Sequence, residues 1–223
     1  MKRPPVPRPA GASRYTWFLG VVLFLAVVGF TINTATTQHA SSTGVPVNSP
    51  LPAFAIPLAL SPLKGDANVS DIAHPSSAGR RPACEVRGRS VLNVCQLAER
   101  GPVVLAFLAT RGARCLGEVD RLNALRSAFP GVQMAAIAIR GDRDDLRRTI
   151  TSRGWRLPVG YDHDGALANL YGVAVCPQIT LASVGGIVRA NLIGEVSTAR
   201  LRRALRALVA DSVRLHWRQP HRA

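Results

Sequence analysis

Apolar residues along this chain gather into short continuous runs, each followed by a segment of helical spacing. Residues 102–109 and 132–139 are two apolar runs of strand length, the pattern of central strands covered on both faces. The helical pattern is carried by Leu116, Val119, Leu122 and Leu125 after the first run, and by Leu146 and Ile150 after the second. Two strand-to-helix units in succession predict that the two strands run parallel in one sheet.

Turn and capping residues mark where these elements begin and end. Pro130-Gly131 stops the first helix. Asp142 and Asp145 form a capping pair for the second helix, and Gly154 ends it. The remaining expected elements are an edge strand at 51–58, a short strand at 157–160, a short helix at 165–171, strands at 178–184 and 187–193 around the two-residue hairpin signal Gly185-Gly186, and a last helix capped by Ser197.

The segment from Tyr15 to Ile32 carries no charge. As a helix it would span about 27 Å, close to the hydrocarbon thickness of a bilayer. Basic residues precede it, and Lys64 is the only lysine or arginine in 31–73, so we expect a cytoplasmic N-terminus and an extracytoplasmic domain at the cell membrane. A cleaved signal peptide is the alternative, for which Gln38-His39-Ala40 is a poor cleavage site.

These features divide the chain into five predicted segments. They are a basic cytoplasmic tail at 1–14, a transmembrane helix at 15–32, a linker at 33–50, a folded domain at 51–212 and a basic tail at 213–223. The linker is rich in Thr, Ser, Ala and Pro and has no apolar period, which predicts an extended tether. Within the domain, residues 64–89 are polar and irregular, which predicts an insertion loop.

The net charge of +15 comes from 28 Lys and Arg residues against 13 Asp and Glu residues. The excess lies mainly at the two ends of the chain, and clusters of this kind can bind nucleic acid or anionic lipid. No nucleic-acid-binding motif or aromatic stacking platform accompanies the arginines, so we expect no nucleic-acid partner. The five histidines lack the i, i+4 pairing of a metal-binding helix, so we expect no metal and no cofactor.

The chain contains four cysteines, and disulfides persist in an exported compartment. Cys115 lies at the start of a helix that leaves a predicted central strand, where the helix N–H groups favour a thiolate. Cys176 precedes Pro177, and an X-Pro bond at such a junction is a candidate for the cis form. Cys84 and Cys95 have no further metal ligand nearby, so we expect a local structural disulfide between them.

Two segments carry a resemblance to a known family, Gly-Pro-Val-Val-Leu-Ala-Phe-Leu-Ala-Thr at 101–110 and Val-Ala-Val-Cys-Pro-Gln-Ile-Thr at 173–180. Together with the element order, they resemble the membrane-anchored thioredoxin-like disulfide reductases of the TlpA type and, more broadly, the redoxin superfamily that includes the peroxiredoxins. The resemblance covers roughly residues 51–209. It implies an α/β thioredoxin-like fold with a central mixed sheet and flanking helices, in which 101–110 leads to the active site and 173–180 holds a cis-proline.

The chain departs from this family at the active-site motif. The family has Trp-Cys-x-x-Cys after the strand, whereas this chain has Arg-Gly-Ala-Arg-Cys at 111–115. Gly112 replaces the attacking cysteine and can neither attack a disulfide nor resolve one. By the family fold, Cys176 would lie close to Cys115, which implies a relocated redox pair. Of the three possible pairings, locality and the family geometry favour 84–95 with 115–176.

In the enzymatic interpretation, Cys115 attacks or holds the substrate sulfur and Cys176 resolves the mixed disulfide. Pro177 would shape the groove in which an extended substrate docks. Arg111 and Arg114 would hold a thiolate or an anionic substrate group by charge, with solvated surface arginines as the alternative. The expected partners are protein thiols or disulfides and a membrane electron donor.

Two other interpretations of the site stay open at the level of sequence. One is a non-catalytic binding or scaffold protein that keeps the fold with structural disulfides or unreactive thiols. The other is a one-cysteine peroxidase, because the peroxiredoxin motif T-x-x-C resembles residues 112–115 with its threonine lost. The missing thiol at Gly112 favours the scaffold, whereas the presence of both Cys115 and Cys176 favours the oxidoreductase.

Overall fold

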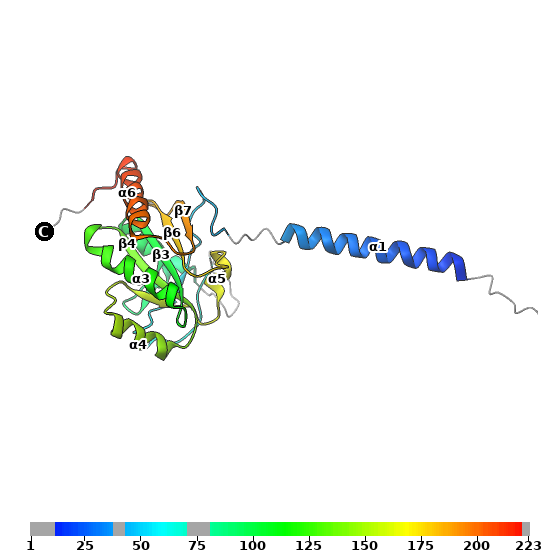
Figure 1. Ribbon diagram of the computed structural model, residues 1–223, viewed down its shortest axis with the longest axis horizontal. Helices are drawn as coiled ribbons and strands as arrows, with labels where there is room; N and C mark the ends of the chain where they lie inside the picture. Colours follow the sequence, from blue (N-terminus) through cyan, green and yellow to red (C-terminus); the bar gives the residue numbers. More distant parts are fainter. Residues whose placement is uncertain (1–11, 38–42, 71–80, 220–223) are drawn as a thin grey trace, which may run out of the picture. The chain divides into compact units, whose positions relative to one another are not determined.

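The computed structural model describes residues 12–37, 43–70 and 81–219 (Figure 1). The chain forms two units, residues 1–41 and 42–223. The described part of the first unit is a single helix, α1 (Ala12–Thr37), on which Trp17 and Phe18 are exposed. Across the described ranges, no helix combines the length and the apolar character needed to cross a membrane. Most of the predicted basic tail at 1–14 lies outside the described residues.

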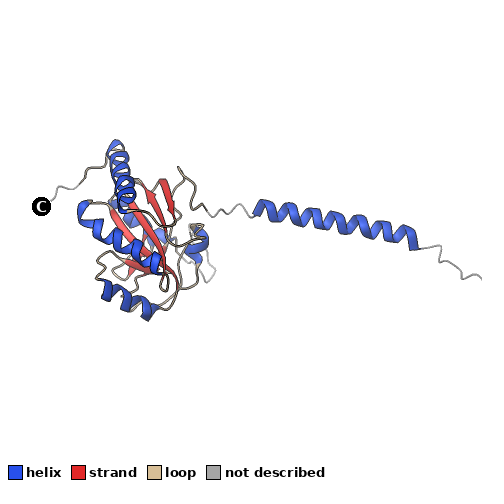
Figure 2. Ribbon diagram, viewed as in Figure 1, coloured by secondary structure: helices blue, strands red, loops and turns tan. Residues whose placement is uncertain are grey.

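A five-stranded sheet lies at the centre of the second unit (Figure 2). In spatial order its strands are β5 (Val159–Tyr161), β4 (Gln133–Arg140), β3 (Val103–Ala109), β6 (Gln178–Ala182) and β7 (Val188–Ile193). β4 runs parallel to both β3 and β5, whereas β6 runs antiparallel to β3 and to β7. The sheet is therefore mixed, and its central parallel pair is formed by the two apolar runs, as predicted.

Alternate residues of β3 face opposite sides of this sheet. Val104, Ala106 and Leu108 belong to one hydrophobic cluster, and Val103, Leu105 and Phe107 belong to the other. Helices α3 (Ala113–Leu125), α4 (Arg143–Arg153) and α6 (Thr198–Arg214) contribute to the first cluster, and α2 (Val94–Arg100) and α5 (Ala166–Leu170) contribute to the second. Both faces of the strand are buried, which explains its continuous apolar run.

A second, two-stranded sheet consists of β1 (Ala55–Pro57) and β2 (Val91–Asn93), which pair antiparallel. Only this part of the predicted strand at 51–58 has strand geometry. The unit formed by β2 and α2 was not predicted from the sequence. The structure also contains short 3-10 turns, η1 (Ala83–Glu85) and η2 (Arg126–Ala128). Part of the predicted insertion loop, residues 71–80, lies outside the described residues.

Three of the predicted helix boundaries are confirmed by their caps, whereas α3 ends at Leu125 and passes into a 3-10 turn before the predicted stop at Pro130-Gly131. The side chain of Asp142 accepts hydrogen bonds from the first-turn N–H groups of α4, and Ser197 caps α6 in the same way. Gly154 ends α4 in the left-handed conformation, with φ of 62°. The hairpin between β6 and β7 also forms, although its loop is longer than two residues, because the N–H of Ser183 donates to the carbonyl of Ile187.

The segment predicted as a linker, 33–50, is partly bonded to the domain. α1 continues to Thr37, and residues 38–42 lie outside the described residues. Beyond them, the N–H of Asn48 donates to the carbonyl of Val188 at 2.8 Å, and Val45 is buried in the second hydrophobic cluster. This end of the linker therefore packs along β7 instead of forming an extended tether.

Candidate functional site

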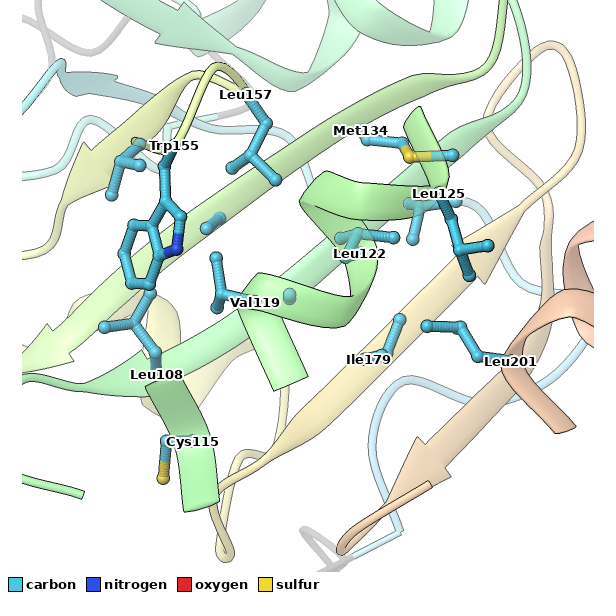
Figure 3. Close-up of a cluster of buried hydrophobic side chains, with 14 of the residues drawn as sticks. Leu108, Cys115, Val119, Leu122, Leu125, Met134, Trp155, Leu157, Ile179 and Leu201 are labelled. Carbon is cyan, nitrogen blue, oxygen red and sulfur yellow. The ribbon is translucent and has the colours of Figure 1, made fainter. Parts of the chain in front are cut away.

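Cys115 lies in the first turn of α3, directly after the central strand. Gly112 is the N-cap residue, so Cys115 is the third residue of the helix. Its side chain is 5% exposed and belongs to the first hydrophobic cluster. Figure 3 shows it at one end of α3, with Val119 and Leu122 following along the helix. The unpaired N–H groups of a first turn carry partial positive charge, which favours a thiolate at this position.

Cys176 lies in the loop between α5 and β6, and its peptide bond to Pro177 is cis. Its side chain is half-buried, while those of the preceding residues, Ala174 and Val175, are exposed. The antiparallel pairing of β3 with β6 brings this loop to α3, because Gln178 at the start of β6 pairs with Phe107 near the end of β3.

A disulfide joins Cys115 to Cys176, with the two Sγ atoms 2.14 Å apart and the two Cα atoms 5.5 Å apart. It connects the N-terminus of α3 to the loop before the cis-proline. A second disulfide joins Cys84 to Cys95, with a Cα–Cα distance of 5.4 Å. This is the pairing that the sequence favoured.

Gly112 supplies the space that the sulfur of Cys115 occupies. A Cβ atom added to Gly112 would lie 2.8 Å from Cys115 Sγ. The backbone angles of Gly112, φ of −99° and ψ of 101°, are open to other residues. The glycine is therefore required by the position of the sulfur and not by the backbone.

The surroundings of the two sulfur atoms differ in polarity. Cys176 Sγ lies 3.5 Å from the carbonyl oxygen of Phe107. A carbonyl oxygen accepts a hydrogen bond from a thiol and disfavours a thiolate beside it. The surroundings of Cys176 thus favour the thiol, while the helix N-terminus at Cys115 favours the thiolate.

Glu118 is a buried carboxylate close to the site that the sequence analysis did not single out. It lies three residues after Cys115 on the same face of α3 and is fully buried. Its Oε2 accepts hydrogen bonds from Nη2 of Arg121 at 2.6 Å and from the N–H of Val196 at 3.3 Å, while Oε1 has no partner within the described structure. The sequence does place Glu118 at helical spacing between Cys115 and Leu122, and this spacing could have predicted that its carboxylate is buried.

Arg111 and Arg114, predicted to bind a thiolate or an anionic group, flank the turn before Cys115, and both are exposed. Nη2 of Arg111 lies 3.9 Å from Oδ2 of Asp145 in the first turn of α4. Within the described residues, Arg114 has no ion pair and neither guanidinium contacts a sulfur. Both side chains therefore face solvent beside Cys115.

The two disulfides lie on opposite faces of the main sheet. Cys115 and Cys176 pack with the first hydrophobic cluster, whereas Cys95 packs against the second. The side chain of Asn93 donates to the carbonyl oxygens of Ala83 and Val86, which fixes the segment around the 84–95 bridge. The 84–95 bridge thus belongs to a local structural unit remote from the cis-proline loop.

A second buried carboxyl group, Asp162, follows β5 at the same edge of the sheet as the end of β3. Its Oδ2 accepts hydrogen bonds from the N–H groups of Leu167 and Ala168 and so caps α5, the helix that precedes the Cys176 loop. Burial raises the pKa of Asp162 to about 6. In the described parts of the chain, no group of three or more His, Cys, Asp or Glu side chains is arranged to hold a metal ion.

No protein-family model and no curated protein matches this sequence. Solved structures do match. A protein from Bacteroides thetaiotaomicron, provisionally described as a protein disulfide isomerase, is 14% identical, with a TM-score of 0.57 over 79% of this chain and 99% of that chain. A candidate thiol:disulfide interchange protein DsbE from Chlorobium tepidum is 17% identical, with a TM-score of 0.56 over 76% of this chain and 99% of that chain.

A third similar structure is a thiol:disulfide interchange protein of the thioredoxin family from Chlorobium tepidum TLS. It is 13% identical, with a TM-score of 0.55 over 74% of this chain and 99% of that chain. At these identities the likeness establishes the fold. The second unit of the chain has the α/β thioredoxin-like fold that the sequence predicted, with a mixed sheet and flanking helices.

Proposed function

We propose that this chain is a thiol–disulfide oxidoreductase of the TlpA type in which the active pair has moved from the CxxC motif to Cys115 and Cys176. The observation that carries the proposal is the disulfide between the first turn of α3 and the loop before the cis-proline. A sulfur at a helix N-terminus is stabilised as a thiolate, and Cys176 is accessible enough to meet a second protein.

The proposed reaction is thiol–disulfide exchange, in which two electrons pass between the substrate and the Cys115–Cys176 pair. A substrate protein with two thiols forms a disulfide and gives up two electrons and two protons, while the Cys115–Cys176 disulfide opens to two thiols. In the opposite direction, the reduced pair opens a substrate disulfide and is itself oxidised. A membrane electron donor would then restore the reduced pair. Exchange of this kind proceeds through a mixed disulfide and uses no cofactor.

The two flanking arginines are proposed as the substrate-contacting residues, and Pro177, which is buried, as the residue that positions Cys176. The cis-proline shapes the backbone beside Cys176, where an extended segment of a protein substrate would dock. Arg111 and Arg114 are exposed beside Cys115 and would attract an acidic group next to the substrate cysteine. Each arginine is therefore expected to affect substrate affinity more than the chemistry of the disulfide.

We further propose that the domain is held on the outer side of the cell membrane by residues 15–32. The uncharged composition of this segment and the basic residues before it support the proposal. After alkaline extraction of cells that produce the full chain, the protein should stay with the membranes, and protease added from outside should digest the domain. Release of a shortened chain into the soluble fraction would instead establish a cleaved signal peptide.

A second candidate function is a non-catalytic binding or scaffold protein. Gly112 lacks the thiol of the family motif, and the 5% exposure of Cys115 also favours this candidate. A one-cysteine peroxidase would need Cys115 as a free thiolate, whereas the structure holds this sulfur in a disulfide.

Reduction of a protein disulfide such as those of insulin distinguishes the two main candidates. The wild-type chain and Cys176→Ala are compared, with the double variant Cys84→Ser/Cys95→Ser as a matched control that removes the other bridge. The oxidoreductase predicts that Cys176→Ala stays folded and loses nearly all activity, while the control keeps it. A loss of stability in Cys176→Ala without any change in exchange would support the scaffold.

A further inference from the structure

We propose that Cys176 is the sulfur that forms the mixed disulfide with the substrate, and that Cys115 is the leaving and resolving sulfur. This assignment deepens the proposed function and rests on it. It reverses the order expected from the sequence, in which Cys115 attacks and Cys176 resolves. Two independent properties of the pair support the assignment, the exposure of the two cysteines and the charges around their sulfur atoms.

The exposure of the two cysteines favours Cys176 as the sulfur that the substrate attacks. A thiolate attacks a disulfide along the line of the sulfur–sulfur bond and must therefore reach the far side of the sulfur that it attacks. Cys115 is 5% exposed and belongs to the same hydrophobic cluster as Leu108 and Val119, so little of it faces solvent. Cys176 is half-buried, and the residue before it, Val175, is 49% exposed. Cys176 is therefore the more accessible of the two cysteines for an incoming thiolate.

The charges around the two sulfur atoms favour Cys115 as the sulfur that leaves. The sulfur that leaves a disulfide departs as a thiolate, and a better stabilised thiolate leaves faster. Cys115 lies at the N-terminus of α3, where backbone N–H groups stabilise negative charge, and the nearby carboxylate of Glu118 is paired with Arg121. Cys176 has a carbonyl oxygen 3.5 Å from its sulfur, which favours a thiol.

A substrate thiolate attacks Cys176 Sγ, the bond between Cys176 and Cys115 breaks, and Cys115 leaves as a thiolate. A second substrate thiolate then attacks the substrate sulfur of the mixed disulfide, which releases the oxidised substrate and leaves Cys176 as a thiolate that takes up a proton. In the opposite direction, the Cys176 thiolate attacks a substrate disulfide, and Cys115 then attacks Cys176 Sγ to release the reduced substrate.

Trapping of the mixed disulfide tests this assignment on the unaltered chain. The oxidised full chain is mixed with a short peptide that contains one cysteine, the reaction is stopped with N-ethylmaleimide, and peptide mapping locates the bound peptide. The assignment predicts at least a tenfold excess of the peptide on Cys176, with N-ethylmaleimide on Cys115. Excess on Cys115, or equal amounts on both, would overturn the assignment while leaving the exchange activity intact.

Single-cysteine variants of the pair give a second readout. Reduced Cys115→Ser should form a stable mixed disulfide with the oxidised peptide. Reduced Cys176→Ser should react at least tenfold more slowly, because the burial of Cys115 outweighs the better stabilisation of its thiolate. Equal rates would contradict the assignment. A wild-type chain that forms no mixed disulfide on either cysteine, under conditions in which the peptide reduces small-molecule disulfides, would overturn the proposed function and this assignment together.

Discussion

Gly112 and Cys115 are coupled by space, because a Cβ atom on residue 112 would lie 2.8 Å from the sulfur of Cys115. In this chain the disulfide sulfur occupies the room that a side chain at residue 112 would need. A glycine at residue 112 and a 115–176 disulfide are therefore two parts of one arrangement.

Gly112→Ala should make the domain a stronger oxidant. The added methyl group crowds the sulfur only while the disulfide holds it in place, because the reduced side chain can rotate away. Overpacking of this kind costs about 1 to 3 kcal/mol. For a two-electron couple this raises the reduction potential by about 20 to 60 mV. Equilibration with glutathione buffers measures the shift.

Gly117→Ala is the matched control for this variant. Gly117 lies in the same helix, and a Cβ atom there meets no other atom within 4 Å. The control should leave the potential unchanged and stabilise the helix by about 1 kcal/mol. Equal potentials for Gly112→Ala and the control would contradict the spatial coupling.

The second prediction concerns pH and Asp162. Its pKa in the folded domain is about 6 because the group is buried, compared with about 3.9 in an unfolded chain. The folded state therefore binds this proton more tightly. The stabilisation is complete below about pH 3.9 and is lost as the pH rises to about 6, with a total of at most about 3 kcal/mol.

Asp162→Asn tests this dependence in urea unfolding between pH 4 and 7. The amide stays neutral and can still accept the hydrogen bonds that cap α5. The free energy of unfolding of this variant should therefore no longer decrease between pH 4 and 6. Asp144→Asn, at an exposed position in α4, is the control, and its free energy of unfolding should still decrease between pH 4 and 6. An unchanged pH profile in Asp162→Asn would show that another group titrates.

The third prediction separates the two disulfides. Cys84→Ser/Cys95→Ser should lower the free energy of unfolding by about 3 kcal/mol, the value expected for a closed loop of this size. Because this bridge and the 115–176 pair pack on opposite faces of the sheet, the reduction potential of the pair should not change. A changed potential in the folded variant would indicate that the bridges are coupled.

The fourth prediction concerns the buried carboxylate of Glu118. Glu118→Gln removes a negative charge from the helix face that carries Cys115, so the ultraviolet absorbance of the Cys115 thiolate, followed in the Cys176→Ser background, should appear at lower pH than with Glu118 present. The free energy of unfolding should fall by about 1 to 3 kcal/mol, because Arg121 loses its charged partner. Glu195→Gln, at an exposed position, should change neither quantity. An unaltered pH profile for Cys115 would rule out this influence.

The sequence predicted the central sheet because its strands are buried on both faces. Residues 103–109 and 134–139 therefore appear as continuous apolar runs, and capping residues such as Asp142 and Gly154 mark the helix that follows. β2 and α2 were not predicted, because a three-residue strand passes directly into a seven-residue helix. Both elements are too short to show the apolar spacing of a strand or of a helix. The side chain of Asn93, which accepts a hydrogen bond from the N–H of Gln96, was the signal available there.

The candidate site was predicted only in part, for physical reasons. The pairing of Cys115 with Cys176 was inferred through the family fold, since 61 positions separate the two cysteines. Their unequal exposure depends on packing between α3 and the sheet, which no local pattern encodes. No local pattern encodes the position of the loop after β1 either. Arg143 and Arg147 fix this loop through hydrogen bonds to its carbonyl oxygens, and both lie more than 80 positions away in the sequence.

The most direct test of the central claim is the reduction potential of each disulfide in the full chain, with peptide mapping at every potential to identify the bonded cysteines. The account predicts that 115–176 opens at a potential well above about −300 mV, the upper limit of structural bridges, while 84–95 stays closed. If the 115–176 bridge stays oxidised below that limit, it is structural, and the chain is not an oxidoreductase that uses this pair.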